Sequence, residues 1–384
     1  MKKLGIFLPA LLIWAGASAQ ESSGGRQPLF PRLSEKGILN HLDVGVSVGT
    51  LGIGLDVALP VGDYVRVRAG YNYMPRISIH SDFAIETSRG NISDMSSKVG
   101  KINDKLAEYN IDLDAPGFEE YKALFEKFQG IEFRDHVTMG LRPNIHQFRF
   151  MVDVLPFRSN KHWSFTAGFF AGPSGVGDAC NLEKETLILE SINAYNAIYR
   201  SYLENNGITA GDYTVSLHTP GHEMDDPFYR YGLAGFNLGT FDDGTKAMMV
   251  PGDDATVRAE MRTSKFRPYL GFGYTTHLSK DRKWNMNVDA GLLFLCGAPS
   301  VYVDNVYKID MDGIGVDADG MYNADIMRYN PQTYEYEPCA ELRQHVDMVR
   351  ELHDIPGKVG SMVHTISRFK VYPNASVTFS YRLF

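Results

Sequence analysis

The chain has 384 residues, of which 44% are hydrophobic and 22% charged, and its formal net charge at pH 7 is −8. An acidic balance of this kind gives no overall attraction for the phosphates of a nucleic acid, so we expect no nucleic-acid partner. Beyond the first residues, no stretch approaches about eighteen uninterrupted apolar residues, and any membrane span must therefore be built from strands.

The N-terminus has the pattern of a cleavable export signal. Two lysines precede an apolar run that ends near Ala15, and the small residues at 17–19 precede Gln20. The run is too short for a helical span, although a signal anchor is the alternative. We expect residues 1–19 to be removed and residues 20–40 to form a periplasmic N-terminal segment.

From residue 41 onward, short segments alternate apolar and polar side chains with the period of a strand. Most are about ten residues long, the length that a tilted strand needs to cross a bilayer. The eight predicted strands are 41–49, 52–60, 63–77, 142–156, 162–173, 265–278, 283–298 and 370–384.

The connections between these strands differ on the two sides of the predicted sheet. Three short polar turns each lead into an aromatic residue, Tyr64, Trp163 or Trp284, which indicates an interfacial aromatic belt. After a tight turn near Gly49, the connections on the other side are long, and they cover about 78–141, 174–264 and 299–369. This asymmetry is typical of bacterial outer-membrane barrels, whose long loops face outward and whose even strand number returns both termini to the periplasm.

Alternation alone would also fit a soluble β-sandwich with its apolar face inward. The aromatic turn flanks, the glycines on the polar face and the aromatic last residue, Phe384, favour the membrane alternative. We therefore predict an all-β transmembrane antiparallel barrel of eight strands over residues 41–384, with long, partly helical extracellular loops.

The segment Val44 to Pro75 (VGVSVGTLGIGLDVALPVGDYVRVRAGYNYMP), together with the terminal SYRLF, resembles the small outer-membrane β-barrel proteins of Bacteroidetes-type bacteria. These are similar in build to the outer-membrane protein A and W barrels. The resemblance covers strands and none of the long loops, and it brings no catalytic residues. Phe384 departs from the family's pattern, since such chains often end on Tyr-Arg-Phe or Tyr-Arg-Leu. The resemblance implies outer-membrane lipid around the barrel and recognition of the C-terminal strand by the barrel-insertion machinery.

Eight closed strands leave a lumen that side chains can fill. Charges that cannot reach bulk water must be paired, so we expect an ion-paired plug, with a narrow selective pore as the alternative. The predicted inward charges are Asp43, Asp56, Arg66, Arg68, Arg149, Asp153, Arg267, Asp289 and Arg382.

The long loops contain three predicted amphipathic helices, near 114–130, 182–206 and 338–353. They would either pack together as a cap over the barrel mouth, or one apolar stripe would bind a partner such as an extracellular ligand. The candidate partner-facing stripe lies on the second helix and consists of Ile188, Ile192, Tyr195, Tyr199 and Tyr202.

The three cysteines allow at most one internal disulfide. Cys180 opens the second long loop and Cys339 lies in the third, so a bond between them would staple the cap. Cys296 would then be the free thiol, on the predicted lipid face of the seventh strand.

The third long loop also holds closely spaced carboxylates, which suit a hard cation such as Ca²⁺. An EF-hand would need a glutamate where Met321 stands, so an acidic solvated turn is favoured and no cofactor is expected, with Ca²⁺ as the alternative. The residues concerned are Asp310, Asp312, Asp317 and Asp319.

No nucleophile-elbow, zinc-protease, phosphate-loop or dinucleotide motif is present in the sequence. We predict no enzymatic activity, and a surface-binding, adhesion or envelope-structural role in the bacterial outer membrane. The alternatives are a narrow porin-like channel and a hydrolase at the barrel rim. Candidates for the latter are His80, His136, His146, Ser174 and Asp178.

Overall fold

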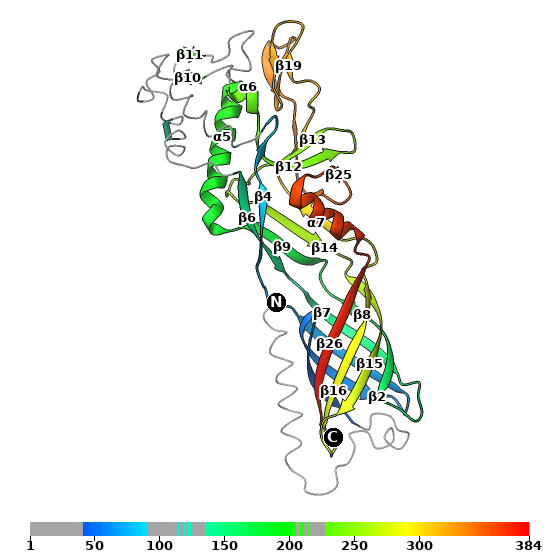
Figure 1. Ribbon diagram of the computed structural model, residues 1–384. Coiled ribbons are helices and arrows are strands. Elements are labelled where there is room, and N and C mark those ends of the chain that lie inside the picture. Colours follow the sequence, from blue (N-terminus) through cyan, green and yellow to red (C-terminus); the bar gives the residue numbers. More distant parts are fainter. Residues whose placement is uncertain are drawn as a thin grey trace.

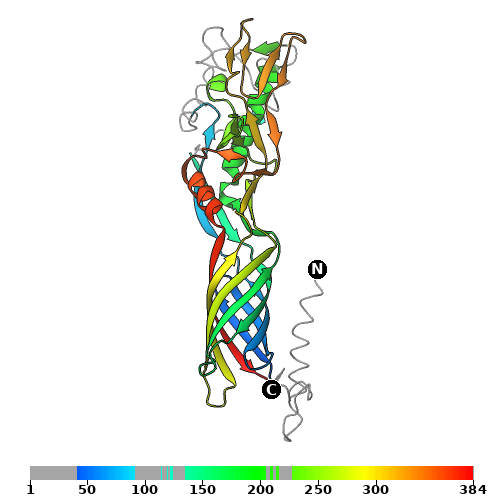
Figure 2. The same ribbon diagram turned by 90° about the vertical axis from the view of Figure 1, so that its right-hand side faces the viewer.

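The computed structural model describes residues 41–90, 135–204 and 227–383, together with 208–210, 213–215 and positions 114, 119, 122 and 123 of the first loop. The predicted export signal and the segment 20–40 lie outside the described residues, as does nearly all of the helix predicted at 114–130. Figures 1 and 2 show a barrel with an elongated cap stacked on one end.

Eight antiparallel strands close into the barrel, with β26 hydrogen-bonded to both β1 and β16. Each strand lies within one of the eight predicted segments, so the predicted barrel is confirmed. The strands are β1 (Asp43–Gly49), β2 (Gly52–Pro60), β3 (Val65–Tyr73), β7 (His146–Val154), β8 (Trp163–Ala171), β15 (Phe266–His277), β16 (Trp284–Phe294) and β26 (Val371–Arg382).

The barrel is apolar outside and polar inside, which is the reverse of a soluble barrel. The outward Val48, Phe165 and Phe272 are 60%, 61% and 53% exposed, whereas the inward Asp153 and Arg68 are buried. Alternation along each strand separates the two faces. An apolar outer surface around a polar interior is the pattern of barrels that span a bilayer.

The three long connections fold together into the cap, and two strands of each contribute to the sheet nearest the barrel. We call this sheet, ordered β24-β17-β14-β9-β6-β4, the stem sheet. Its strands are β4 (Ile79–Ala84), β6 (His136–Pro143), β9 (Gly175–Asn181), β14 (Arg258–Arg262), β17 (Ser300–Val303) and β24 (Val346–Asp347).

A second sheet lies farther from the barrel, and three strand pairs complete the cap. The second sheet contains β23 (Glu341–Arg343), β18 (Val306–Ile309), β13 (Lys246–Met249), β12 (Ala234–Phe241), β25 (Leu352–His353) and β5 (Glu86–Thr87). The pairs are β10 (Ile208–Ala210) with β11 (Tyr213–Val215), β19 (Gly315–Val316) with β20 (Tyr322–Asn323), and β21 (Met327–Asn330) with β22 (Glu335–Pro338).

The described helices are the short η1 (Glu183–Glu185), α5 (Thr186–Glu204), α6 (Pro227–Tyr231) and α7 (Gly357–Arg368). Helix α5 lies within the segment predicted as the second helix. None of the described helices has both the length and the apolar character needed to cross a membrane.

The predicted partner-facing stripe of α5 is buried inside the cap, so that prediction was wrong. All five of its side chains are at most 7% exposed. The tyrosine rings of the stripe pack on α6, where Tyr202 and Phe228 stack with ring centroids 4.9 Å apart. Helix α5 also contacts β12. The stripe faces inward because the cap has to bury its own apolar surface before any could be left for a partner.

The helix predicted at 338–353 is also absent, since this segment forms β23, β24 and β25. Val346 is fully buried in the stem sheet, whereas Leu342 is 46% exposed. Pairing with strands that are distant in sequence outweighs the local helical spacing here.

The predicted disulfide between Cys180 and Cys339 is not formed, and all three thiols are free. Cys180 lies in β9 of the stem sheet, whereas Cys339 follows β22 and lies against the carbonyl oxygen of Asp325. The two cysteines therefore lie on different parts of the cap, Cys180 within the stem sheet and Cys339 after the end of β22. Cys296 lies beyond the end of β16 with a φ of 55°, so its predicted place on the lipid face was also wrong.

Candidate functional site

The structure brings most of the predicted inward charges together in the barrel lumen. Arg68 donates to Asp153 at 2.8 Å and to Asp289 at 2.7 Å, and Arg66 donates to Asp153 at 2.7 Å. Arg149 is similarly held by Asp56, at 2.7 Å from its Nε.

At the short-turn end of the barrel, Arg382 pairs with Asp43 at 3.3 Å. The pair of Arg68 with Asp289 crosses the lumen from β3 to β16, whereas most of the other pairs join neighbouring strands. Glycines make room for them, since a Cβ on Gly273 would lie 2.7 Å from Asp289 Oδ1.

The lumen also carries a group of apolar side chains, the apolar layer, in which Phe170 lies opposite Arg149 in the strand register. Met151, Phe170 and Tyr269 point inward from β7, β8 and β15 and are at most 2% exposed. The Phe170 and Tyr269 rings meet edge to face with centroids 5.7 Å apart. Charged and apolar side chains together fill the interior of the barrel.

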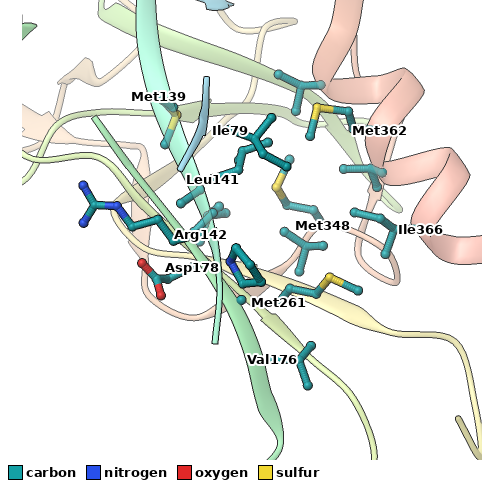
Figure 3. A pocket seen from close by; sticks show the side chains of 18 of the residues that line it. Ile79, Met139, Leu141, Arg142, Val176, Asp178, Met261, Met348, Met362 and Ile366 are labelled. Atoms are coloured by element: carbon teal, nitrogen blue, oxygen red, sulfur yellow. The ribbon is translucent and has the colours of Figure 1, made fainter. Parts of the chain in front are cut away.

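Above the apolar layer, the structure contains a chamber of about 500 Å³ between the stem sheet and α7. Figure 3 shows Met139, Leu141, Met261 and Met348 on one side and Met362 and Ile366 of α7 on the other. The volume of the chamber falls in the range of small-molecule sites, about 300–1,000 Å³. Its predominantly apolar lining is also typical of such sites. Methionine side chains adapt to ligands of different shape because they are unbranched and polarizable.

Helix α7 forms the wall of the chamber opposite the stem sheet. Val359, Met362, Val363 and Ile366 follow the i, i+3, i+4, i+7 spacing of one helical face, and all four line the chamber. This helix was not among the predicted elements, although the same spacing directly after Pro356 is a helix signal in the sequence.

The chamber has an apolar rim at the barrel mouth and a lateral opening. Leu51, Leu293 and Tyr372 lie at the mouth. Ile79 also lines the chamber, yet it is 61% exposed and lies on β4, the edge strand of the stem sheet. The chamber is therefore open to solvent along this edge.

The fifth predicted inward arginine, Arg267, lies at the chamber floor and not among the ion pairs. It is 3% exposed, and it precedes Tyr269 on the inward face of β15 by two residues, on the cap side. Arg267 and its partner Gln147 both line the chamber.

A second polar cluster lies deep in the cap around Asp325, which is fully buried. Tyr199 and Ser88 each donate a hydroxyl hydrogen bond to its carboxylate, and the Leu233 N–H donates at 2.8 Å. Burial and the neighbouring Asp325 raise the pKa of Tyr199 well above 10. The cluster ties α5, β12 and the third long loop together, so we assign it a structural role.

The four aspartates considered for Ca²⁺ lie in two turns of the third loop. Asp310 pairs with Arg328 at 3.1 Å, and Asp317 accepts hydrogen bonds from the N–H groups of Asp319 and Met321. Within the described residues, no group of three or more histidine, cysteine, aspartate or glutamate side chains is arranged to hold a metal ion.

The hydrolase candidates are spread over two parts of the molecule, with His80, His136 and Asp178 in the stem sheet and His146 at the start of β7 in the barrel. His136 and His80 lie on the paired strands β6 and β4, but they are not opposite each other. His136 lies opposite Ala84, which is four positions along β4 from His80. That separation is about 13 Å at the usual rise of a strand. His136 contacts the exposed Asp135 at 2.6 Å.

No protein-family model and no curated protein matches this chain. Among solved structures, the crystal structure of CarO2 from Acinetobacter baumannii is 12% identical, with a TM-score of 0.35 over 90% of this chain and 99% of that one. The crystal structure of CarO from the same organism is 11% identical, with a TM-score of 0.34 over 93% of this chain and 99% of that one. Likeness at this level says nothing about what this chain binds or does.

Proposed function

We propose that this chain is a non-enzymatic binding protein of the bacterial outer membrane that holds a small apolar molecule in the chamber between the stem sheet and α7. The observation that carries the proposal is a large, apolar chamber that stands open at its side above a lumen filled with ion pairs. The barrel then serves as an anchor and the cap as the binding part. Adhesion and a purely structural role would both leave this chamber without a purpose.

The outer membrane is proposed because strand-built spans with short turns at one end and long connections at the other are characteristic of that membrane. The resemblance of Val44 to Pro75 and of the terminal strand to small outer-membrane barrels supports the same location. In this orientation the cap is extracellular, both termini are periplasmic, and the barrel-insertion machinery recognises the C-terminal strand.

Burial of apolar surface would supply the affinity, at about 0.8 kcal/mol for each methylene group removed from water. Several lining side chains, among them Met139, Met348 and Val363, are already buried in the free protein, so a ligand would not have to order them. A channel is the second function considered from the sequence, and the ion pairs across the lumen argue against it.

The test is photolabelling of the protein in lipid nanodiscs with a neutral long-chain alkyl diazirine. We expect mass spectrometry to find labelled peptides from β6, β14 and α7, in addition to lipid-facing peptides of the barrel. Val176 lies in the chamber wall, so Val176→Trp should fill the space and remove the chamber labels while the barrel labels stay (Figure 3).

Val316→Trp is the matched control, because Val316 is 53% exposed on β19 at the far end of the cap (Figure 1). It should leave the chamber labels unchanged. Labelling confined to the outer face of the barrel in the wild-type protein would refute the proposed function.

A further inference from the structure

Arg267 differs from the other four inward arginines in its surroundings. Arg66, Arg68, Arg149 and Arg382 each contact an aspartate in the lumen. Arg267 is just as buried, yet none of the described carboxylates lies within 4.0 Å of its guanidinium. A buried charge without a counter-charge is costly, which makes this position the natural site for an anion.

The contacts of Arg267 are all with neutral oxygen atoms. Its Nε lies 3.1 Å from Thr263 Oγ1 and 2.8 Å from the Ser264 carbonyl oxygen, and its Nη2 donates to the Pro173 carbonyl oxygen at 2.8 Å. Its Nη1 donates to Gln147 Oε1 at 2.7 Å. A guanidinium has five N–H groups, so these bonds leave donors available and leave the positive charge uncompensated.

Gln147 supplies a second donor at the same place. Its side chain is 1% exposed, and its Nε2 has no acceptor among the described residues. Because Oε1 already accepts from Arg267, the amide hydrogens are directed away from that bond. Both side chains line the floor of the chamber, directly below its apolar walls.

From this arrangement we propose that the chamber ligand is a long-chain carboxylate. The single alkyl chain lies between the stem sheet and α7, and the carboxylate accepts hydrogen bonds from Arg267 and Gln147 at the barrel mouth. A chamber of about 500 Å³ suits one chain better than the two chains of a phospholipid. The inference rests on the proposed function, because it identifies the headgroup of the same ligand.

The experiment compares palmitate with methyl palmitate as competitors of the neutral diazirine in nanodiscs. The two molecules have the same chain and differ in charge, so the comparison needs no variant. We expect palmitate to displace the chamber labels at a concentration at least about tenfold lower, since one charge-assisted pair is commonly worth a factor of ten or more.

The Arg267→Gln variant should lose this preference while methyl palmitate competes as before, and Arg267→Lys should retain part of it. Arg142→Gln is the matched control, because Arg142 also lines the chamber but is exposed and points away from the apolar side chains (Figure 3). It should keep the preference. Arg267 also ties the Pro173 and Ser264 segments together, so the folding of each variant has to be checked. A folded barrel gives a heat-modifiable band, which runs at a different apparent mass on a gel before and after boiling.

Equal competition by palmitate and its methyl ester in the wild-type protein would overturn the carboxylate assignment and leave the apolar chamber as a binding site. The same conclusion would follow if Arg142→Gln removed the preference and Arg267→Gln did not. Stronger competition by dodecyl phosphate than by palmitate would overturn the choice of a carboxylate. Absence of any chamber label, by contrast, would refute the proposed function itself.

Discussion

Asp289 on β16 accepts two hydrogen bonds from Arg68 on β3, at 2.7 and 2.9 Å. In the closed order of eight strands, β3 and β16 are four strands apart in either direction, so they lie on opposite walls. The contact therefore crosses the full width of the lumen. It links the first half of the chain to the second at a distance of 221 positions.

The first prediction follows from this crossing. Arg68→Met should lower the stability of the barrel by about 3–5 kcal/mol, because Asp289 would be left as a buried charge without a cation. The measurement is urea unfolding of the protein in lipid vesicles, in which the loss of the heat-modifiable band reports the unfolded fraction.

Asp63→Asn is the control for Arg68→Met. It removes a pair with Lys161 that spans 3.7 Å between exposed side chains, and such pairs contribute about 0–1 kcal/mol. An unchanged midpoint in Arg68→Met would mean that the crossing contact does not stabilise the barrel.

The strands of the barrel could be predicted from the sequence because lipid on one side and a polar lumen on the other impose strict alternation. Strand β3 shows this directly, since Arg66 and Arg68 point inward and Val67 points outward. Period-two patterns survive in the sequence wherever both faces of a strand have a fixed environment.

The chamber could not be predicted in the same way. Leu51, Met139, Met261 and Met362 meet in it, yet they come from four connections that are distant in the sequence. The unpaired state of Arg267 was also hidden, because alternation gives the face of a residue and not its height in the lumen. Arg267 lies opposite Phe170 on the neighbouring strand, and long-range packing decides which charged groups it can reach.

The second prediction concerns alkaline pH. The pKa of Tyr199 is raised well above 10 in the folded cap, chiefly by burial, so the unfolded chain loses this proton at a lower pH than the folded one. Stability from this group is therefore complete below about pH 10 and declines as the pH rises further. Protease resistance of the cap should fall above pH 10, and less steeply in Tyr199→Phe than in wild type.

Tyr199→Phe should in addition cost about 1–3 kcal/mol at neutral pH, since Asp325 loses one buried donor. Tyr334→Phe is the control, because Tyr334 is 79% exposed. An identical alkaline slope in Tyr199→Phe and wild type would show that Tyr199 does not cause the loss.

The third prediction concerns the free thiols. Cys296 and Cys339 are both exposed at the surface, but partial burial raises the pKa of the Cys339 thiol. Because the thiolate is the reactive form, a maleimide at pH 7 should modify Cys296 faster than Cys339. Peptide mapping after timed quenching gives the two rates. A mobility change on reduction, which would indicate an internal disulfide, should not occur.

The fourth prediction concerns conductance. The lumen is filled both by the ion pairs around Arg68 and by the apolar layer around Phe170, so the wild-type protein should not conduct in planar bilayers. Shortening either barrier alone, in Arg68→Ser or in Phe170→Ala, leaves the other in place, and each variant should also be silent. The double variant Arg68→Ser and Phe170→Ala should open brief, small conductance steps.

Arg68→Ser and Phe170→Ala each remove a buried side chain, so the variants could fail to fold. Bilayers are therefore formed only from protein that still shows the heat-modifiable band. Phe165→Ala serves as the control. Phe165 is 61% exposed on the outer face of the same strand, so its loss changes the lipid contact and not the lumen. Conductance in the wild-type protein would favour the channel function. Conductance in Arg68→Ser alone would show that the apolar layer does not block ions, and that the ion pairs are the single barrier between the chamber and the opposite end of the barrel.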